Sequence, residues 1–273
     1  MARLDATARD YVCRMCSECQ GMKVLVLDTV TTKIVSMVYT QSQILQHEVF
    51  LIDNIQHPKP EKMPHLKAVY FLRPTAENVR LLQQELRDPK YGEYRLFFSN
   101  LTRDGMIQQL AEADEHEVVQ QVNDLFADYL AVTPELFELS VPSVAGLSGP
   151  VWDQPVFDRI HQGVCSLLLS LKKRPTIRYQ RSSEMCQRVA ETILGAMEAE
   201  VDLYSFRRPE TPPLLLLLDR RDDPVTPLLS QWTYQAMTHE LIGISDNRVD
   251  LRGAPGVPRE LEQIVLSVEH DPF

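Results

Sequence analysis

Short apolar runs alternate with amphipathic stretches along the first half of the chain. Each run is bounded by polar or turn-forming residues, as is typical of strands, and the predicted strands cover residues 23–28, 49–53, 66–72, 95–98 and 127–132. Apolar residues recur at helical spacing in the stretches around them, and the predicted helices cover residues 4–19, 29–46, 74–86 and 105–114. The last helix is expected to continue or restart through Val118, Val119, Val122 and Leu125. Such alternation predicts an α/β domain with a parallel five-stranded sheet flanked by helices.

A small-residue segment separates this half from a second α/β pattern. Residues 140–150 read SVPSVAGLSGP, which is typical of a linker, so the first domain is expected to end at residue 139. The second pattern begins with a helix over residues 155–171, and then continues with a strand over 176–180 and a helix over 184–198.

A strongly apolar strand and a helix complete the second pattern. Leu214–Leu218 contains no polar alternation, which predicts a strand buried on both faces. A charged turn follows at Asp219–Asp223, and Thr226–Pro227 then offers an N-cap hydroxyl and a proline suited to the first helical position. Apolar residues recur at helical spacing over residues 228–241, and Gly243 stands where a C-terminal cap is expected. The segment is therefore predicted to form a strand, an acidic turn and a helix.

Composition narrows the classes of partner. The chain has 273 residues, of which 44% are hydrophobic and 24% charged, and its net charge is −10. This excess of acid argues against nucleic acid as the main partner and against a broad electrostatic hold on anionic lipid. No apolar run approaches the length of a membrane span, and the opening MARLDATARDYVCRM lacks the apolar core of a secretory signal. We therefore expect a cytoplasmic protein with reduced thiols.

The predicted turns between strands and helices lack the residues that hold phosphate groups. The first turn, Asp28–Thr32, contains no glycine, and no GxxxxGK[ST], GxSxG or HExxH pattern occurs. The turn Asp219–Asp223 is the one catalytic candidate, because carboxylates at the end of a strand are where an α/β enzyme would hold Mg²⁺. Arg220 and Arg221 lie beside these acids, so we favour an ion-paired turn that caps the next helix. An α/β enzyme, or a nucleotide- or magnesium-binding protein that uses this turn, is the alternative function.

A cluster of cysteines near the N-terminus raises the question of a metal. The spacing CxxCxxC occurs at Cys13, Cys16 and Cys19. A tetrahedral site needs a fourth ligand, but Cys165 and Cys186 lie far away in sequence and His47 has no paired neighbour. We interpret the three cysteines as small side chains on one helix that touch the domain, and we predict no metal and no cofactor.

The string LLLLLDRRDDPVTPLLSQWTYQAMTHELIGI resembles the signature segment of the SM proteins, the Sec/Munc-type cytosolic regulators of SNARE-mediated membrane fusion. The matching elements are Asp219–Arg220, Asp223–Pro224, Pro227–Leu229, residues 233–237 and Glu240–Leu241. The stretches MKVLVLDTVTTKIVSMVYTQSQILQ and LKAVYFLRPTAENVRLLQQELRDPKYGEYRLFFSN are similar as well, and they resemble the vacuolar-protein-sorting branch that serves the Golgi and endosomes. The resemblance covers residues 21–273.

This resemblance implies a regulator of vesicle docking and membrane fusion in Golgi–endosome–vacuole transport, and not an enzyme. The implied partners are a syntaxin-type SNARE, the assembled SNARE bundle and a Rab effector, and the protein would meet Golgi and endosomal membranes only through the SNARE. SM proteins have three domains, which implies domain one over residues 1–139, the first segment of domain two over 140–245 and the start of domain three over 246–273. The second sheet is then incomplete, because its remaining strands come from a later segment.

The resemblance also implies two partner-binding surfaces on the first domain. An outer pocket for the N-terminal peptide of the syntaxin would be formed by Ile107, Leu110, Val122 and Asp124. A cleft surface would use Asp28, Lys33 and Asp53. Where some relatives have arginine, Lys33 keeps the charge but loses the bidentate fork. Without the resemblance, the three apolar residues of the outer pocket would be interpreted as ordinary core.

Overall fold

The structure is a computed structural model that describes residues 3–58, 61–147, 152–207 and 209–266. The chain forms two compact units, Met1–Leu217 and Leu218–Phe273. The domain boundaries expected after residues 139 and 245 lie inside these units and stay predictions. Part of the predicted linker, residues 148–151, lies outside the described residues.

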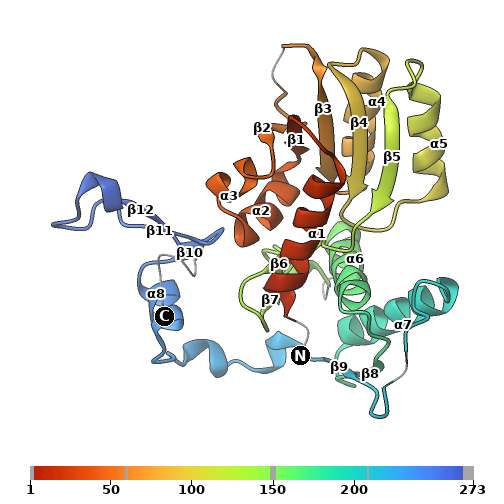
Figure 1. Cartoon of the computed structure of the whole chain (residues 1–273). Coiled ribbons are helices and arrows are strands. Elements are labelled where there is room, and N and C mark those ends of the chain that lie inside the picture. The colour runs from red at the N-terminus through yellow and green to blue at the C-terminus, as the bar shows by residue number, and fades with distance from the viewer. Residues whose placement is uncertain (1–2, 59–60, 148–151, 208, 267–273) are drawn as a thin grey trace. The chain divides into compact units, whose positions relative to one another are not determined.

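A five-stranded parallel sheet forms the centre of the first unit, which confirms the predicted fold class (Figure 1). The strand order is β2-β1-β3-β4-β5, and every neighbouring pair is parallel. The strands are β1 (Lys23–Leu27), β2 (Val49–Asn54), β3 (Met63–Leu72), β4 (Tyr91–Phe98) and β5 (Val119–Asp124).

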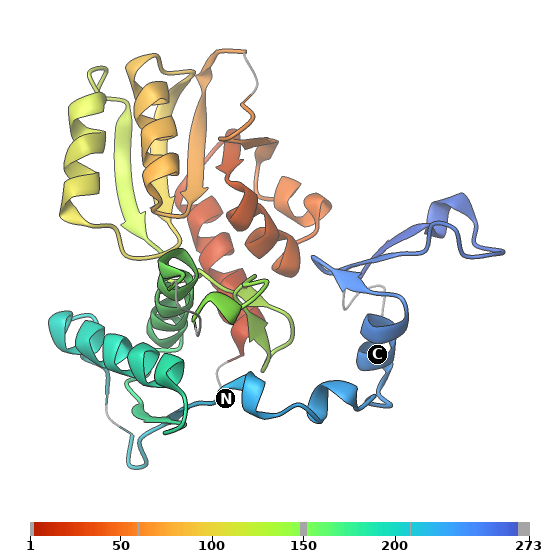
Figure 2. The same cartoon turned by 180° about the vertical axis from the view of Figure 1, so that it is seen from behind.

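Helices cover both faces of this sheet, so its central strands are buried on two sides. On one face pack α1 (Leu4–Glu18), α2 (Thr29–Val38) and α3 (Gln41–Leu45). On the other pack α4 (Ala76–Arg87) and α5 (Asp104–Ala113), which lie in front of the sheet in Figure 2. Successive side chains of a strand point to opposite faces, and those of β1 accordingly alternate between the two hydrophobic clusters.

One predicted helix is two helices in the structure. The stretch 29–46 breaks between α2 and α3, because the Thr40 hydroxyl accepts a hydrogen bond from the backbone N–H of Gln43 at 3.3 Å and so begins a new helix.

The predictions for the fifth strand and for the helix before it were wrong. The fifth strand is Val119–Asp124, and not residues 127–132; helix α5 ends at Ala113 and does not continue through this segment. The Asp114 carboxylate accepts the backbone N–H groups of Val118 and Val119, each at 3.0 Å, and directs the chain into the strand. Residues 127–132 contain only the short strand β6 (Leu130–Ala131), which pairs antiparallel with β7 (Phe137–Glu138).

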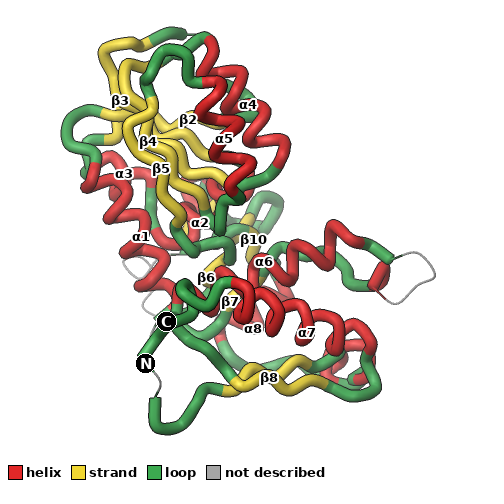
Figure 3. The backbone as a smooth tube through the Cα atoms, turned by 90° about the vertical axis from the view of Figure 1, so that its right-hand side faces the viewer, coloured by secondary structure: helices red, strands yellow, loops and turns green. Residues whose placement is uncertain are grey.

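The second α/β pattern follows within the first unit. Helices α6 (Gln154–Ser170) and α7 (Glu184–Ala199) pack against each other and against a two-stranded parallel sheet of β8 (Thr176–Tyr179) and β9 (Leu214–Leu217). Figure 3 shows α7 beside β8. Before α6, a 3₁₀ turn at Ala145–Leu147 buries Leu147 in the same hydrophobic cluster.

The leucine run is buried on one face only, which corrects the prediction of two-sided burial. Leu215 and Leu217 pack against the cluster around α6 and α7, whereas Leu214 is 57% and Leu216 53% exposed. Two strands are described in this sheet, and helices pack on one of its faces, so alternate leucines remain at the surface.

The second unit contains short elements. Helix α8 (Tyr234–Leu241) is shorter than predicted, because Thr226–Leu228 forms a separate 3₁₀ turn and the Thr226 side chain caps no helix. Gly243 takes its predicted place after α8: its φ is +97°, a left-handed conformation that glycine adopts without strain. Strands β10 (Ile244–Ser245), β11 (Arg248–Asp250) and β12 (Gln263–Val265) form an antiparallel sheet.

Two neighbouring residues of α7 test how this helix packs. Ile193 is fully buried, whereas the adjacent Leu194 is 46% exposed. We expect Ile193→Ala to lower the free energy of unfolding by about 2–4 kcal/mol, because it leaves a cavity in the core. Leu194→Ala should change it by less than about 0.5 kcal/mol. Urea denaturation of both variants measures the difference, and equal losses would contradict the described packing.

Candidate functional site

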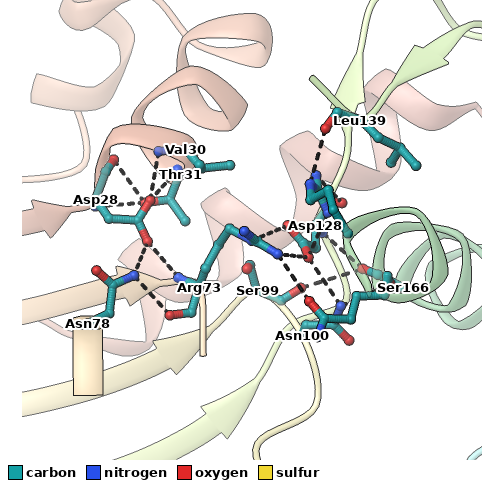
Figure 4. A network of polar contacts seen from close by, with 12 residues as sticks. Asp28, Val30, Thr31, Arg73, Asn78, Ser99, Asn100, Asp128, Leu139 and Ser166 are labelled. Atoms are coloured by element: carbon teal, nitrogen blue, oxygen red, sulfur yellow. Dashed lines mark hydrogen bonds and ion pairs between the residues drawn. The ribbon is translucent and has the colours of Figure 1, made fainter. Parts of the chain in front are cut away.

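The carboxyl ends of the parallel strands are where α/β proteins usually bind ligands. Asp28, directly after β1, lies at this edge and is 1% exposed. Its Oδ1 accepts the backbone N–H groups of Val30 at 2.8 Å and Thr31 at 2.7 Å, which caps α2. Its Oδ2 accepts the backbone N–H of Arg73 and the side-chain amide of Asn78, both at 2.7 Å (Figure 4). Internal donors therefore surround both oxygens of the Asp28 carboxylate.

A second buried carboxylate lies at the same edge of the sheet, between two arginines. Asp128 is fully buried, and the side chains of Arg73 and Arg159 are each 14% exposed. Arg73 donates from Nε to Asp128 Oδ1 at 2.9 Å, and Arg159 Nη1 lies 3.0 Å from Oδ2. Burial lowers the pKa of the Arg159 guanidinium, and the Asp128 carboxylate opposes this shift. Each buried guanidinium therefore relies on the Asp128 carboxylate for its neutralising charge, and Asp128 relies on the two arginines.

The Asp128 network ties the sheet to helix α6. Arg159 lies on α6 and donates to the backbone carbonyls of Leu139 and Asp128, each at 3.1 Å. Asn100, just after β4, donates to the Gln162 carbonyl of α6 at 2.9 Å and to Asp128 Oδ2 at 3.2 Å. Figure 4 shows these groups in one continuous network. The carboxyl ends of the strands, where α/β proteins usually bind a ligand, are therefore occupied here by the protein's own polar side chains.

Sequence reasoning missed this network, although signals for it existed. Arg73 follows an apolar strand without an intervening turn, and Asp128 falls inside a stretch expected to be a buried strand. A buried charge requires a partner of opposite sign, so an acid at such a position indicates a nearby cation. Sequence alone does not reveal that Arg159, 31 residues later, supplies it.

The four residues of the expected outer pocket lie on or beside α5 and β5, with different exposures. Ile107 and Val122 are 41% and 37% exposed, whereas Leu110 is 3% exposed and belongs to the core between the sheet and α4–α5. Val122 is in register with Leu96 of that same core, so both side chains lie on the face that α5 covers. Exposed apolar side chains of α5 and β5 thus share one side of the sheet at its edge.

Asp124 stands at the end of β5 beside these apolar residues. Its carboxylate accepts the backbone N–H of Thr102 at 3.1 Å and the Thr102 hydroxyl. Burial raises the pKa of the Asp124 carboxyl, and the hydrogen bonds from Thr102 oppose that shift. Asp124 therefore anchors the loop that leads into α5.

The residues of the expected cleft surface lie on or after β1, α2 and β2, on the side of the sheet farthest from β5. Asp53 lies on β2, is 8% exposed and accepts the backbone N–H of Asn54 at 2.9 Å. Lys33 lies on α2 and is half-buried. Asp53 is in register with Val26 of β1, so it lies at the same carboxyl edge as Asp28. Of the three, Lys33 is the most accessible.

The acidic turn of the second unit contains the predicted ion pairs. Arg221 Nη2 lies 2.5 Å from Asp219 Oδ2, and Arg220 Nη1 lies 2.6 Å from Asp223 Oδ2. The hydroxyl and backbone N–H of Thr226, together with Arg220, lower the pKa of Asp223 to about 2. The two carboxylates therefore have cationic partners of their own.

Two of the three cysteines near the N-terminus belong to the core, whereas Cys13 is half-buried on α1. Cys16 and Cys19 are buried in the hydrophobic cluster beneath α1, and burial raises the pKa of the Cys16 thiol to about 11. Across the described ranges, no group of at least three His, Cys, Asp or Glu side chains is arranged to hold a metal ion. In the same ranges, no helix has the length and apolar character needed to cross a membrane.

Comparison with known proteins gives consistent matches. The model of the Sec1 family matches residues 23–273. Vacuolar protein sorting-associated protein 45 of Mus musculus is 52% identical over 266 residues, which cover 97% of this chain and 46% of the mouse protein. A solved structure of the SM protein Vps45 has a TM-score of 0.94 and 47% identity, covering 100% of this chain and 52% of its own. A second solved structure, of Vps45 in complex with the Qa SNARE Tlg2, also has a TM-score of 0.94 and 47% identity, covering 99% of this chain and 49% of its own. The chain spans about half the length of the curated relatives it matches.

Neutralising Asp128 tests the buried network. In Asp128→Asn, two guanidinium groups lose their carboxylate inside the protein, and we expect a loss of about 3–5 kcal/mol in the free energy of unfolding. The control is Glu184→Gln, which breaks the exposed pair between Glu184 and Arg188 on α7 and should cost less than about 1 kcal/mol. Urea denaturation measures both. A loss for Asp128→Asn no larger than that of the control would refute the structural importance of the network.

Proposed function

The chain belongs to the Sec1 family of SM proteins, and from this premise we propose that it binds a syntaxin-type Qa SNARE and regulates vesicle docking and membrane fusion in Golgi–endosome–vacuole transport. The observation that carries the proposal is the match to Vps45 solved in complex with the Qa SNARE Tlg2, at 47% identity over 99% of this chain. The name of the mouse relative, which refers to vacuolar protein sorting, supports the same transport route.

The proposal concerns the part of an SM protein that the chain contains. The chain covers 46% of the mouse relative, and it includes the whole five-stranded sheet. A binding surface carried by this sheet and its helices is therefore available in the chain. Binding of the assembled SNARE bundle or of a Rab effector, and peripheral association with Golgi and endosomal membranes through the SNARE, are part of the same proposal.

We assign the contact with the N-terminal peptide of the SNARE to the exposed edge formed by α5 and β5. A short flexible peptide loses conformational entropy on binding, and a few buried apolar anchors must offset that loss. Ile107 and Val122 are exposed apolar side chains that can receive such an anchor, with Leu110 in the core beside them. Asp124 supplies an acid next to them, which favours a cationic group in the peptide. For the cleft contact we assign Lys33, the most accessible of the three expected residues, together with Asp28 and Asp53.

We also propose that the chain acts without catalysis. The Asp28 and Asp128 carboxylates, which lie where an α/β enzyme would bind its ligand, are occupied by internal donors. Asp219 and Asp223 are paired with Arg221 and Arg220. These contacts support a role in protein–protein recognition over the alternative of a magnesium- or nucleotide-dependent enzyme.

Substitutions on α5 test the peptide surface. Ile107→Arg places a charge where an apolar anchor must bind, and an unpaired desolvated charge costs several kcal/mol. That cost is comparable with the roughly 8 kcal/mol of a micromolar complex, so the N-terminal peptide of a Qa SNARE should no longer bind detectably. Fluorescence anisotropy measures this binding, and circular dichroism should give an unchanged melting curve, because Ile107 is exposed.

Two further variants make this test specific. Gln108→Arg adds the same charge at the neighbouring exposed position of α5 and should leave peptide affinity unchanged. Leu110→Arg should instead abolish the cooperative melting curve, since Leu110 is 3% exposed. If folded Ile107→Arg binds the peptide as tightly as the unmodified chain, the assignment of the surface is wrong.

The enzyme alternative has its own test. A ligand that binds the native state raises the melting temperature in a concentration-dependent way. Because Asp219 and Asp223 are already ion-paired, we expect the melting temperature of the chain to be the same with Mg²⁺ and ATP as with EDTA. A rise that increases with Mg²⁺–nucleotide concentration and disappears in Asp223→Asn would favour the alternative.

A further inference from the structure

A pocket of about 540 Å³ lies beside the two-stranded sheet, and it shares no residue with the surfaces discussed above. Its size is within the usual range of ligand pockets. Three segments form it: the end of the α6–β8 loop at residues 172–176, the chain after α7 at residues 201–207, and the prolines Pro209, Pro212 and Pro213 before β9. All of them belong to the first compact unit.

The charged residues of this pocket are all of one sign. Lys172, Lys173, Arg174 and Arg207 contribute to its lining, and none of the described lining residues is Asp or Glu. All four are exposed, and within the described residues none of them forms an ion pair with an acid. The chain as a whole has 38 acidic against 28 basic residues, so an unpaired cationic cluster stands out against its average surface. Such a cluster attracts an anionic partner.

The remaining wall of the pocket is apolar and held in place. Tyr204 is 3% exposed and packs edge-on against Phe206, with ring centroids 6.2 Å apart, so it forms a fixed floor. Val201 is 52% exposed at the rim. The Thr176 backbone N–H donates to the Pro213 carbonyl at 2.8 Å and joins two of the three segments. Proline restricts the backbone, which limits the entropy lost on binding.

We propose that this pocket binds a short acidic peptide segment that carries one bulky apolar side chain. The apolar side chain would lie against Tyr204, Phe206 and Val201, and the acids would pair with Lys173, Arg174 and Arg207. The floor provides an apolar surface that a compact polyphosphate would leave unused. An anionic bilayer is disfavoured by the net charge of −10.

The test uses the full 273-residue chain and a fluorescein-labelled probe peptide. The probe is a short glutamate-rich peptide with one central phenylalanine, and binding is measured by fluorescence anisotropy. We expect saturable binding that weakens with added salt and weakens again when the phenylalanine of the probe is replaced by serine.

The double variant Lys173→Glu and Arg174→Glu should lower the affinity by about tenfold or more, because two attractive contacts become repulsive. Lys172 is left unchanged in this variant, because its φ of +53° is left-handed, and a substitution there could alter the backbone as well as the charge.

A matched control separates the pocket from general electrostatics. The double variant Arg178→Glu and Arg181→Glu makes the same change in net charge at exposed positions that do not line the pocket. It should change probe affinity by less than about twofold, and melting curves should show that both variants are folded. Equal weakening by the two double variants, or no saturable binding of the probe, would overturn the proposal. A third result would also overturn it: the chain binds vesicles that contain phosphatidylserine and phosphoinositide, this binding is lost in the Lys173→Glu and Arg174→Glu variant, and the probe peptide does not bind.

Discussion

The buried carboxylate of Asp128, held between the guanidinium groups of Arg73 and Arg159, is the constraint on which the first unit depends. Strands of a parallel sheet end with polar groups at one edge, and these groups must be satisfied by a ligand, by water or by the protein. Here Arg73 connects both carboxylates of that edge, because its backbone N–H donates to Asp28 and its side chain to Asp128. Arg159 and Asn100 extend the network to α6, so the sheet and the second α/β pattern are joined by charge as well as by apolar packing.

The internal pairing of Asp28 and Asp128 leaves these two carboxylates without open positions for a ligand, so other surfaces of the fold are better suited to binding. The outer edge at α5 and β5 and the cationic pocket after α6 are accessible features that lie away from the Asp128 network. Strand β5 is an edge strand with the sequence VQQVND, and its polar side chains discourage uncontrolled pairing with other sheets. Its exposed Val122 and the neighbouring Ile107 leave a small apolar surface, which suits a short peptide better than a large flat partner.

The sequence predicted the sheet best where burial is most uniform. Strands β1 to β4 each contain an apolar run, and periodicity detects such runs directly. In β1 and in the carboxyl halves of β3 and β4 these runs are buried, because helices cover both faces of the sheet there. Strand β5 has mixed exposure, and its valines match helical spacing, so periodicity predicts a helix there and a strand in the apolar stretch after it. The leucines of β9 indicated two-sided burial that the described sheet provides on one face only. The Asp128 network depends on contacts between residues far apart in sequence, which periodicity does not encode.

The central claim is that the chain binds a Qa SNARE through the edge formed by α5 and β5. Hydrogen–deuterium exchange of the chain, with and without the cytosolic part of a syntaxin-type Qa SNARE, tests it most directly. The account predicts slower exchange of backbone amides in α5, in β5 and in the loop at Thr102 that Asp124 anchors. Exchange that is unchanged throughout these segments at saturating SNARE would contradict it.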